Sequence, residues 1–449
     1  FEELNRAGIM PTKSMGQMGI IQECIVGPPY EIFTKNGKMK PNKKGKAALA
    51  FIFITVLIDV IGLGIIIPVV PSLIIELTGQ TISNAAEYGG LLMFIYAGTQ
   101  FLFAPVIGAL SDRYGRRPLL LSSLCAYGLN YLLLAWAPTI WWLFFARFLS
   151  GITGATTTTA SAYVADISDP EEKAQNFGLL GAAFGLGFII GPVIGGILGE
   201  YGSRLPFIAA AILSLVNFTY GYFILPESLA KKERRSFEWK RANPFGALKK
   251  IRDFSAATGL FLVFFLIYLS HHATQSTWTY YTMFKFSWDE AMVGISLGVV
   301  GICVAVVQGG LTRWWIPRIG PNKAVYLGIG AYVIGFLGFA WAPNGSIMLA
   351  MIMPYALGGF AGPSLQGILS NQVPANMQGE LQGVLTSLIS FSAIIGPPVM
   401  TQSFSYFSTN QMLYMPGAPF ILGAFLSILA LIIGVKTLGH VVEKSVEIS

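Results

Sequence analysis

Twelve long apolar runs limit most strongly what this chain can fold into. Each is about as long as the roughly 20 mostly apolar residues that a membrane helix needs. Open sheets leave unsatisfied edges in lipid, and the runs are too continuous for barrel strands. The sequence therefore predicts an all-α membrane protein with 12 transmembrane helices. The runs cover residues 48–70, 88–110, 118–137, 140–165, 175–198, 205–226, 256–278, 291–313, 322–342, 345–370, 380–404 and 414–436.

The composition agrees with this prediction and argues against a soluble enzyme. The chain is 54% hydrophobic and 11% charged, whereas soluble domains carry about 25% charged residues. A net charge of +7 is often a sign of an acidic partner. Here the basic residues lie in loops between apolar runs, so membrane topology explains them, and we expect no nucleic-acid partner. The three cysteines lack metal-ligand spacing.

The basic residues lie on alternate sides of the runs. They gather before the first run, after the second run, in the long loop after the sixth run and after the eighth run. Loops on the opposite side hold few, Arg204 and Lys285 among them. Basic loops stay in the cytoplasm, so we expect both termini of a multi-pass membrane protein to be cytoplasmic.

The longest polar connection divides the chain into two sets of six helices. We expect a cytoplasmic N-terminal extension at 1–45, a first half at 46–226, a linker at 227–255, a second half at 256–437 and a cytoplasmic tail at 438–449. A repeat supports the division, because Ile-Ile-Gly-Pro at 189–192 recurs at 394–397, an offset of 205. The same offset pairs Gly115 with Gly320. Parallel six-helix repeats are typical of secondary transporters.

A charged loop follows the second run, in the stretch "GALSDRYGRRPLL". A topological anchor needs only its arginines and leaves the acid and the turn glycine unexplained. The loop resembles the signature of the major facilitator superfamily, which has the form Gly-x-x-x-Asp-Arg-x-Gly-Arg-Arg. The matching residues are Gly108, Asp112, Arg113, Gly115, Arg116 and Arg117.

This resemblance implies a cytoplasmic latch between the two halves. Asp112 is expected to meet a helix N-terminus of the second half, where an anion is favourable. An arginine is expected to pair with Asp166 at the end of helix 4. In the corresponding second-half stretch, Pro317 stands where the acid would be. The sequence therefore predicts one intact latch.

Further stretches resemble proton-driven drug antiporters, with bacterial tetracycline efflux pumps as the closest likeness. The stretch "GLGFIIGPVIGG" resembles their helix 5 motif, with Gly187, Gly191, Pro192, Gly195 and Gly196. Its small residues recur every four positions, which also suits ordinary close packing of helices. The stretches "LIDVIGLGIIIPVVP" and "ARFLSGITGAT" resemble their helices 1 and 4. The likeness spans about residues 48 to 436.

The chain departs from these pumps at two places. They carry an acid in helix 3 where this chain has Asn130, and a histidine in helix 8 where it has the stretch "GICVAVVQG". These differences put tetracycline itself, and the full proton pathway of the pumps, in question.

Asp59 is the acid that the apolar pattern places deep within a helix. Counted from Lys46, it lies about 20 Å along the first helix. A lone intramembrane acid is a functional candidate by default, and its task would be to gain and lose a proton. The alternatives are a structural ion pair with Arg147, the intramembrane cation of helix 4, or a neutral acid that is hydrogen-bonded for packing. In a proton-coupling site, Arg147 would favour the ionised form of Asp59 or contact substrate.

His271 and His272 are the competing proton carriers, in helix 7. They are too few for a metal site. In the structural interpretation they are hydrogen-bonded core histidines. In the functional interpretation they contact substrate or relay protons. Polar and aromatic residues suited to a bulky, partly apolar ligand could line a central cavity. These are Tyr96, Gln100, Asn130, Tyr131, Gln275, Trp278, Gln308 and Gln366.

No nucleotide-binding loop, catalytic nucleophile motif or metal motif is present, so we expect no enzyme and no cofactor. The pattern and the resemblance favour a monomeric proton-coupled antiporter that exports a lipophilic or amphipathic small molecule, a tetracycline-like drug included. Two alternatives stay open. One is proton-linked uptake of a small metabolite, and the other is a transporter-like partner protein that does not transport.

Overall fold

The computed structural model describes residues 43–154, 156–169, 172–237, 246, 257–374 and 377–447. The expected N-terminal extension therefore lies outside the described residues up to position 42, as does most of the linker beyond 237. The helices of both halves lie in one compact unit that begins at Ala48.

The described chain is helical, and each of the twelve expected runs forms a helix or a set of stacked helices. The first half contains α3 (Lys43–Ile65), η1 (Ile67–Val69), α4 (Val70–Thr78), α5 (Ile82–Tyr114), α6 (Arg116–Ala135), α7 (Ile140–Thr153), α8 (Thr156–Ile167), α9 (Lys173–Gly199) and α10 (Leu205–Ile224), followed by η2 (Lys231–Glu233) in the linker. The second half contains α12 (Thr258–Phe286), α13 (Glu290–Ala305), the π-helix η4 (Val306–Leu311), α14 (Thr312–Ile319), α15 (Pro321–Trp341), α16 (Gly345–Ala350), α17 (Ile352–Leu357), η5 (Gly358–Phe360), α18 (Ala361–Asn371), α19 (Gln378–Thr409) and α20 (Ala418–Glu447).

Ten of these helical stretches within the described residues are long and apolar enough to cross a membrane. The other two runs have physical reasons to fall short. Helix 4 is split at Gly154 into α7 and α8, of 14 and 12 residues, and α12 carries two histidines and several Thr and Ser residues. Together they complete the twelve transmembrane helices that the sequence predicts. The helix α20 also extends to Glu447, through most of the segment expected as a tail.

Local sequence explains where several helices begin and end. Thr81 accepts a hydrogen bond from Asn84 N–H and caps α5, while Asp289 and Asn344 cap α13 and α16 through Met292 and Ile347 N–H. Such N-cap side chains satisfy otherwise unbonded helix amides. Gly115 and Gly320, the repeat-related pair, end α5 and α14 with φ of 107° and 82°, a region that favours glycine.

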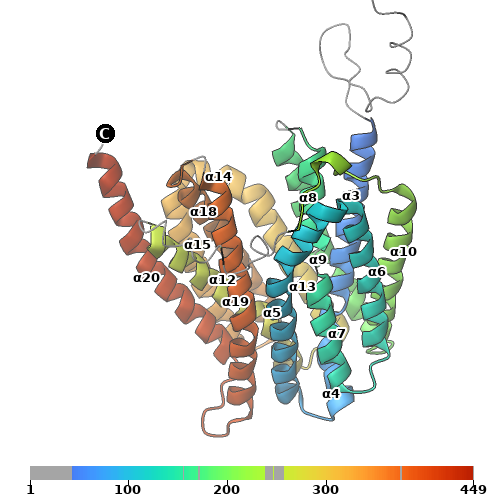
Figure 1. Ribbon diagram of the computed structural model, residues 1–449. Coiled ribbons are helices and arrows are strands. Elements are labelled where there is room, and N and C mark those ends of the chain that lie inside the picture. The colour runs from blue at the N-terminus through green and yellow to red at the C-terminus, as the bar shows by residue number, and fades with distance from the viewer. Residues whose placement is uncertain are drawn as a thin grey trace, which may run out of the picture. The chain divides into compact units, whose positions relative to one another are not determined.

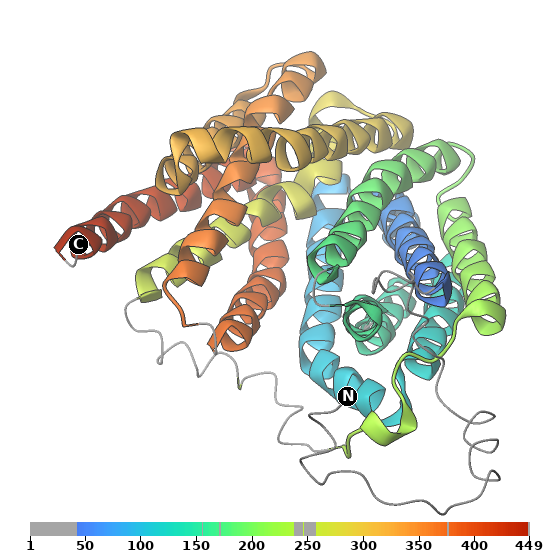
Figure 2. The same ribbon diagram turned by 90° about the horizontal axis from the view of Figure 1, so that it is seen from above.

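The helices of the two halves form two groups that meet along specific pairs. Figure 2 shows the blue-to-green helices of the first half gathered on one side and the yellow-to-red helices of the second half on the other. The helix α9 packs against α13, and α5 packs against α19. Figure 1 shows α5, α13 and α19 close together in the middle of the molecule.

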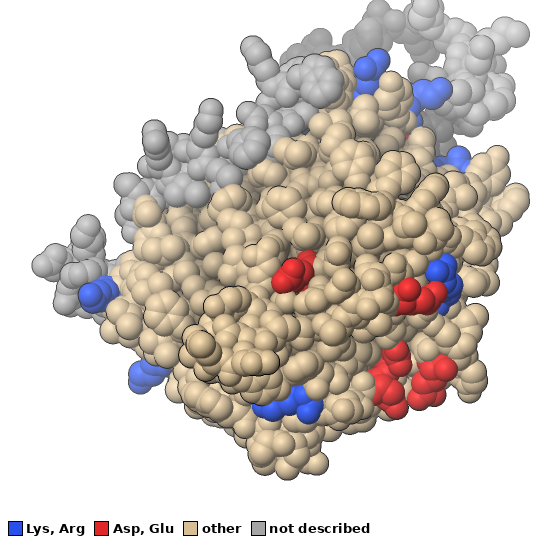
Figure 3. Space-filling view, turned by 90° about the horizontal axis from the view of Figure 1, so that it is seen from below, with Lys and Arg blue, Asp and Glu red and all other residues tan. Residues whose placement is uncertain are grey.

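The contacts between the halves include a set at one end of the helices. Ser83, at the start of α5, accepts a hydrogen bond from Ser408 near the end of α19 (2.8 Å). Ser72 of α4 donates to Glu290 at the start of α13. We call this the joined end. Figure 3 views the molecule from the side of α4 and shows a mostly uncharged face with few Lys and Arg residues.

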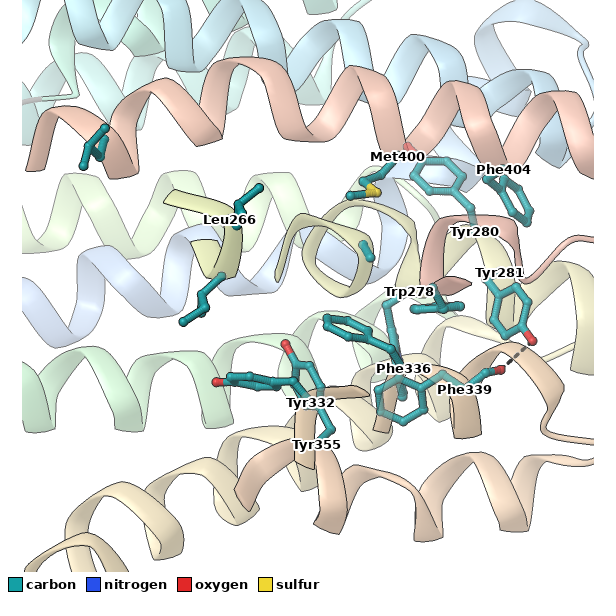
Figure 4. Close-up of a cluster of buried hydrophobic side chains, with 14 of the residues drawn as sticks. Leu266, Trp278, Tyr280, Tyr281, Tyr332, Phe336, Phe339, Tyr355, Met400 and Phe404 are labelled. Atoms are coloured by element: carbon teal, nitrogen blue, oxygen red, sulfur yellow. Dashed lines mark hydrogen bonds between the residues drawn. The ribbon is translucent and has the colours of Figure 1, made fainter. Parts of the chain in front are cut away.

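The second half has an aromatic core. Trp278 packs on Phe339 with ring centroids 5.1 Å apart, and Phe339 also contacts Tyr355 and Phe420. The Tyr281 hydroxyl donates to the Phe339 carbonyl oxygen (2.7 Å), as Figure 4 shows. This cluster joins α12, α15, α17 and α20, and it makes the second half a packed body around helix 7.

Candidate functional site

A polar cluster lies inside the first half, around the middle of helices 1 to 4. It combines Asp59 of α3, Tyr96 and Gln100 of α5, Tyr131 of α6 and Arg147 of α7. Asp59, Tyr96, Gln100 and Arg147 are partly exposed, while Tyr131 is buried. The charges of Asp59 and Arg147 both act on the phenols of Tyr96 and Tyr131. The structure therefore brings these five predicted residues together.

Asp59 and Arg147 do not form an ion pair in this cluster. Among the described residues, neither takes part in a contact of 4.0 Å or less between opposite charges. The alternative of a structural Asp59–Arg147 pair therefore finds no support in this conformation. An acid without such a partner inside an apolar half is unusual, because a buried charge is costly unless it is paired.

The break in helix 4 adjoins this cluster. The Gln100 side-chain amide donates to the Gly154 carbonyl oxygen (2.9 Å) and to the Tyr96 hydroxyl (3.2 Å). A helix end in the membrane needs such partners for its free carbonyls. A Cβ atom at Gly154 would lie 3.0 Å from the Tyr127 hydroxyl oxygen, so the break is closely packed. Tyr127, which the sequence did not single out, thereby joins the site.

Three residues expected in the cavity are buried, namely Tyr131 of the cluster, Asn130 and Trp278. Asn130 is 5% exposed and donates to Ser150 Oγ (2.6 Å), so it ties α6 to α7. Trp278 is 1% exposed and donates from Nε1 to Ser296 Oγ (2.9 Å). The polarity of such side chains indicates that they avoid lipid. It does not show whether they line a cavity or lie at a contact between two helices.

The three glutamines of the second half that were expected in the cavity are exposed. Gln308 lies in the π-helix η4, and its Nε2 would be 3.3 Å from a Cβ atom at Gly359. Gln366 donates to Gln382 Oε1 (3.0 Å) across α18 and α19. Gln275 lies on α12. Single-turn π-helices often mark functional sites, and this one falls in the helix 8 stretch where no ionisable residue stands.

The histidines of α12 have no hydrogen bond on one nitrogen each. Nε2 of His271 and Nδ1 of His272 are buried without a partner among the described residues. The interpretation as hydrogen-bonded core histidines therefore finds no support at these two nitrogens. They also face different neighbours. His271 lies against Tyr332 with ring centroids 4.6 Å apart, whereas a Cβ atom at Gly396 would lie 2.7 Å from His272 Cβ.

The glycine motif of α9 lies between one helix of each half. Cβ atoms at Gly187, Gly191 and Gly195 would fall within 3 Å of α3 atoms at Val60, Ile61 and Ile65. On the neighbouring face, Gly196 contacts the backbone of α13 at Glu290 and Ala291. A Cβ atom at Gly64 of α3 would lie 2.9 Å from Pro192 Cδ. The motif thus permits close packing on two sides.

The loop between α5 and α6 forms a charged network on the first half. Arg116 pairs with Asp112 (2.6 Å) and with Asp166 (3.1 Å). The Arg117 guanidinium donates to the Tyr222 carbonyl oxygen (2.7 Å). In the described part of the chain, the Asp112 carboxylate pairs within its own loop, so its expected meeting with a second-half helix stays a prediction. Gly108 and Arg116 line a small cavity with Asp112, Thr158 and Thr159.

Glu227 is a member of this network that the sequence did not reveal. Its carboxylate accepts from Arg116 N–H (2.8 Å) at the start of α6, and it pairs with Arg234 (3.6 Å). The Arg235 amide also donates to the Asp112 carbonyl oxygen (3.2 Å). A Cβ atom at Gly115 would overlap the Glu227 carboxylate. The start of the linker therefore caps α6, which is a long-range contact that spacing alone cannot show.

Comparison with known proteins fits this arrangement. The family model described as Major Facilitator Superfamily matches residues 52–397. The chain belongs to the Major Facilitator Superfamily. It is 38% identical over 377 residues to the tetracycline resistance protein of class C from Escherichia coli, covering 84% of this chain and 94% of that protein. It is 39% identical over 393 residues to the class E protein from Escherichia coli, covering 87% and 94%.

Solved structures of this superfamily share the fold. The human organic anion transporter MFSD10 (TETRAN) aligns with a TM-score of 0.65 at 22% identity, over 88% of this chain and 100% of that one. The nucleoside transporter NupG aligns with a TM-score of 0.71 at 14% identity, over 87% and 99%. The chain is thus an integral multi-pass membrane protein of a transporter superfamily, with two six-helix halves.

Proposed function

We propose that this protein exports a lipophilic or amphipathic small molecule, a tetracycline-like drug included, in exchange for protons. The observation that carries the proposal is the cluster inside the first half in which Asp59, without an ion-pair partner among the described residues, shares two tyrosine neighbours with Arg147. The names of the relatives, tetracycline resistance proteins of classes C and E, support the same function.

In the proposed cycle, protonation of Asp59 and binding of the drug to the first-half cluster exclude each other. Asp59 gains the proton from one side of the membrane and releases it to the other as the halves rock around the site. Arg147, which has no ion-pair partner among the described residues, approaches Asp59 as the halves rock and then helps to expel its proton, because a nearby cation favours the carboxylate. The exposed glutamines of the second half supply hydrogen bonds to the drug without adding charge.

The proposed orientation places the joined end outside and the linker in the cytoplasm. The basic loops support it, because the segment after α10 and the α5–α6 loop carry Lys and Arg clusters while the joined end carries few. We further propose that the protein acts as a monomer in a bacterial inner membrane. In this orientation the structure would represent the form whose halves touch at the outer end.

Transport of tetracycline into proteoliposomes with an imposed pH gradient tests the proposal. Wild-type protein should accumulate the drug against its gradient, and Asp59→Asn should abolish this uphill transport while retaining drug binding. A matched control is Asp289→Asn, since Asp289 caps α13 at the joined end and lies away from the cluster. Gradient-driven transport by Asp59→Asn at the wild-type rate would overturn the assignment of Asp59. Absence of gradient-driven transport by the wild type would overturn tetracycline–proton exchange.

A further inference from the structure

The interior of the second half holds titratable groups of a different kind from those of the first. In its described residues, the Asp and Glu side chains belong to positions at or near helix ends, namely Asp289, Glu290, Glu380, Glu443 and Glu447. His271 and His272 lie in the middle of α12. Nε2 of His271 is buried and has no partner, and a buried polar atom without a partner calls for an explanation.

His271 lies within a cage of tyrosines from three helices. Its ring is 4.6 Å from Tyr332 of α15, 5.8 Å from Tyr268 of α12 and 6.3 Å from Tyr355 of α17, measured between ring centroids. Figure 4 shows Tyr332 and Tyr355 next to each other. Among the described residues, the titratable groups that face His271 are these phenols and the neighbouring His272. An aromatic ring stabilises a cation that lies over its face within about 6 Å of the centroid, a distance that Tyr332 and Tyr268 meet.

The repeat relates this cage to the cluster around Asp59. The offset of 205 that pairs Gly191 with Gly396 also pairs Tyr127 with Tyr332 (332 − 127 = 205) and Gly154 with Gly359. Tyr127 packs on the break in helix 4 and lies close enough to Asp59 to feel its charge. Tyr332 packs on the break in helix 10, where its ring would overlap a Cβ atom at Gly358. In each half, the repeat-related tyrosine lies between a helix break and a titratable group.

The two titratable groups lie at different levels along their helices. By the same offset, Asp59 corresponds to Phe264, so His271 is seven positions further along its helix. Seven residues of an α-helix span about 10 Å. Since α3 and α12 both run toward the joined end, His271 lies nearer to that end than Asp59 does. A proton entering when the joined end opens would therefore reach the level of His271 first.

We propose that His271 is a second proton-binding site, housed in the tyrosine cage of the second half, whose Tyr332 is repeat-related to Tyr127 of the Asp59 cluster. The inference rests on the proposed exchange of drug for protons and deepens it. When the joined end opens, a hydronium ion transfers its proton to the free lone pair of Nε2. The transfer forms an N–H bond and leaves water. The imidazolium returns the proton to water when the cycle opens the opposite end. Each cycle thus moves one more proton than Asp59 alone carries.

Counting the protons released on drug binding tests this site. Purified protein in weakly buffered detergent is mixed with tetracycline, and the released protons are divided by the drug bound. His271→Gln should release one proton fewer per drug than wild type. Asp59→Asn should also release one proton fewer, because it removes the proton of the first-half site. The control His440→Gln makes the same substitution near the C-terminus and should release the wild-type number. Equal release by His271→Gln and wild type would overturn the proposal.

A second measurement keeps the proposal testable if His271→Gln does not fold. The chain has three histidines, so ring-labelled histidine NMR of the intact protein can follow each one against pH. The His271 signal should titrate, and its midpoint should move when tetracycline is added. An unmoved His271 signal, with drug binding and proton release otherwise intact, would overturn the second site alone. Absence of any proton release by the wild type would instead count against the proposed exchange.

Discussion

Replacing Gly191 by alanine tests whether close contact between α9 and α3 holds the first half together. Gly191 is buried, and a Cβ atom there would lie 2.7 Å from the Ile61 carbonyl oxygen and 2.9 Å from Gly64 Cα. Ordinary contact begins near 3.4 Å, so α3 and α9 would have to separate by about 0.7 Å to restore it. Both obstructing atoms belong to the backbone, so no rotation of a side chain can relieve the overlap.

The same helix offers a matched control in Gly185. This residue is exposed, and a Cβ atom there would meet no atom within 4 Å. Both substitutions gain helix propensity of up to about 1 kcal/mol, so the difference between them isolates the contact. Overpacking a close interface costs about 1–3 kcal/mol. We therefore expect Gly191→Ala to be less stable than Gly185→Ala by roughly that amount.

Thermal unfolding of the detergent-solubilised variants, followed by tryptophan fluorescence, measures this difference. Gly185→Ala should unfold at or above the wild-type midpoint, and Gly191→Ala clearly below it. Tetracycline transport at a temperature where both remain folded should be reduced in Gly191→Ala. Equal midpoints for the two variants would refute the argument, because it assigns their whole difference to the α3–α9 contact.

Two further predictions concern the α5–α6 loop and the linker. Glu227→Ala should remove the cap on α6, which costs about 1 kcal/mol of stability and speeds hydrogen exchange of the Arg116 amide. The control Glu233→Ala, on the exposed η2, should leave that exchange rate unchanged. An unchanged exchange rate in Glu227→Ala would exclude the capping role. Asp112→Asn should barely change the unfolding midpoint, because a partly exposed pair contributes about 0–1 kcal/mol, yet it should slow transport if the latch forms during the cycle. Wild-type transport rates in Asp112→Asn would reduce the acid to a local partner of Arg116.

The main features of the fold could be predicted from the sequence because lipid imposes a simple rule. Backbone groups cannot remain unbonded in the bilayer, so runs of apolar residues of sufficient length must become helices. The loop signature and the Gly-Pro repeat then indicated the superfamily and its two halves. The same reasoning located Asp59, Arg147 and the α12 histidines within helices, since a titratable residue inside an apolar run is conspicuous.

Which of these residues meet was decided by the tertiary structure. Helical periodicity gives a side chain's direction relative to its own helix, but not which helix lies opposite. For this reason Asn130 and Trp278 were expected in a cavity and lie in the core. Gln100 bonds to a break in helix 4 that a run of small and polar residues did not disclose. Glu227 reaches α6 from more than a hundred positions away.

The sequence was enough to determine that this chain forms twelve membrane helices in two related halves, because the composition of each apolar run decides whether that run can lie in lipid. The tertiary structure alone decided that Asp59 and Arg147 do not pair with each other, that α9 packs between α3 and α13, and that His271 lies among three tyrosines. The physical reason is that burial in a membrane is a property of each segment, whereas a contact depends on the mutual fit of two surfaces distant in the chain.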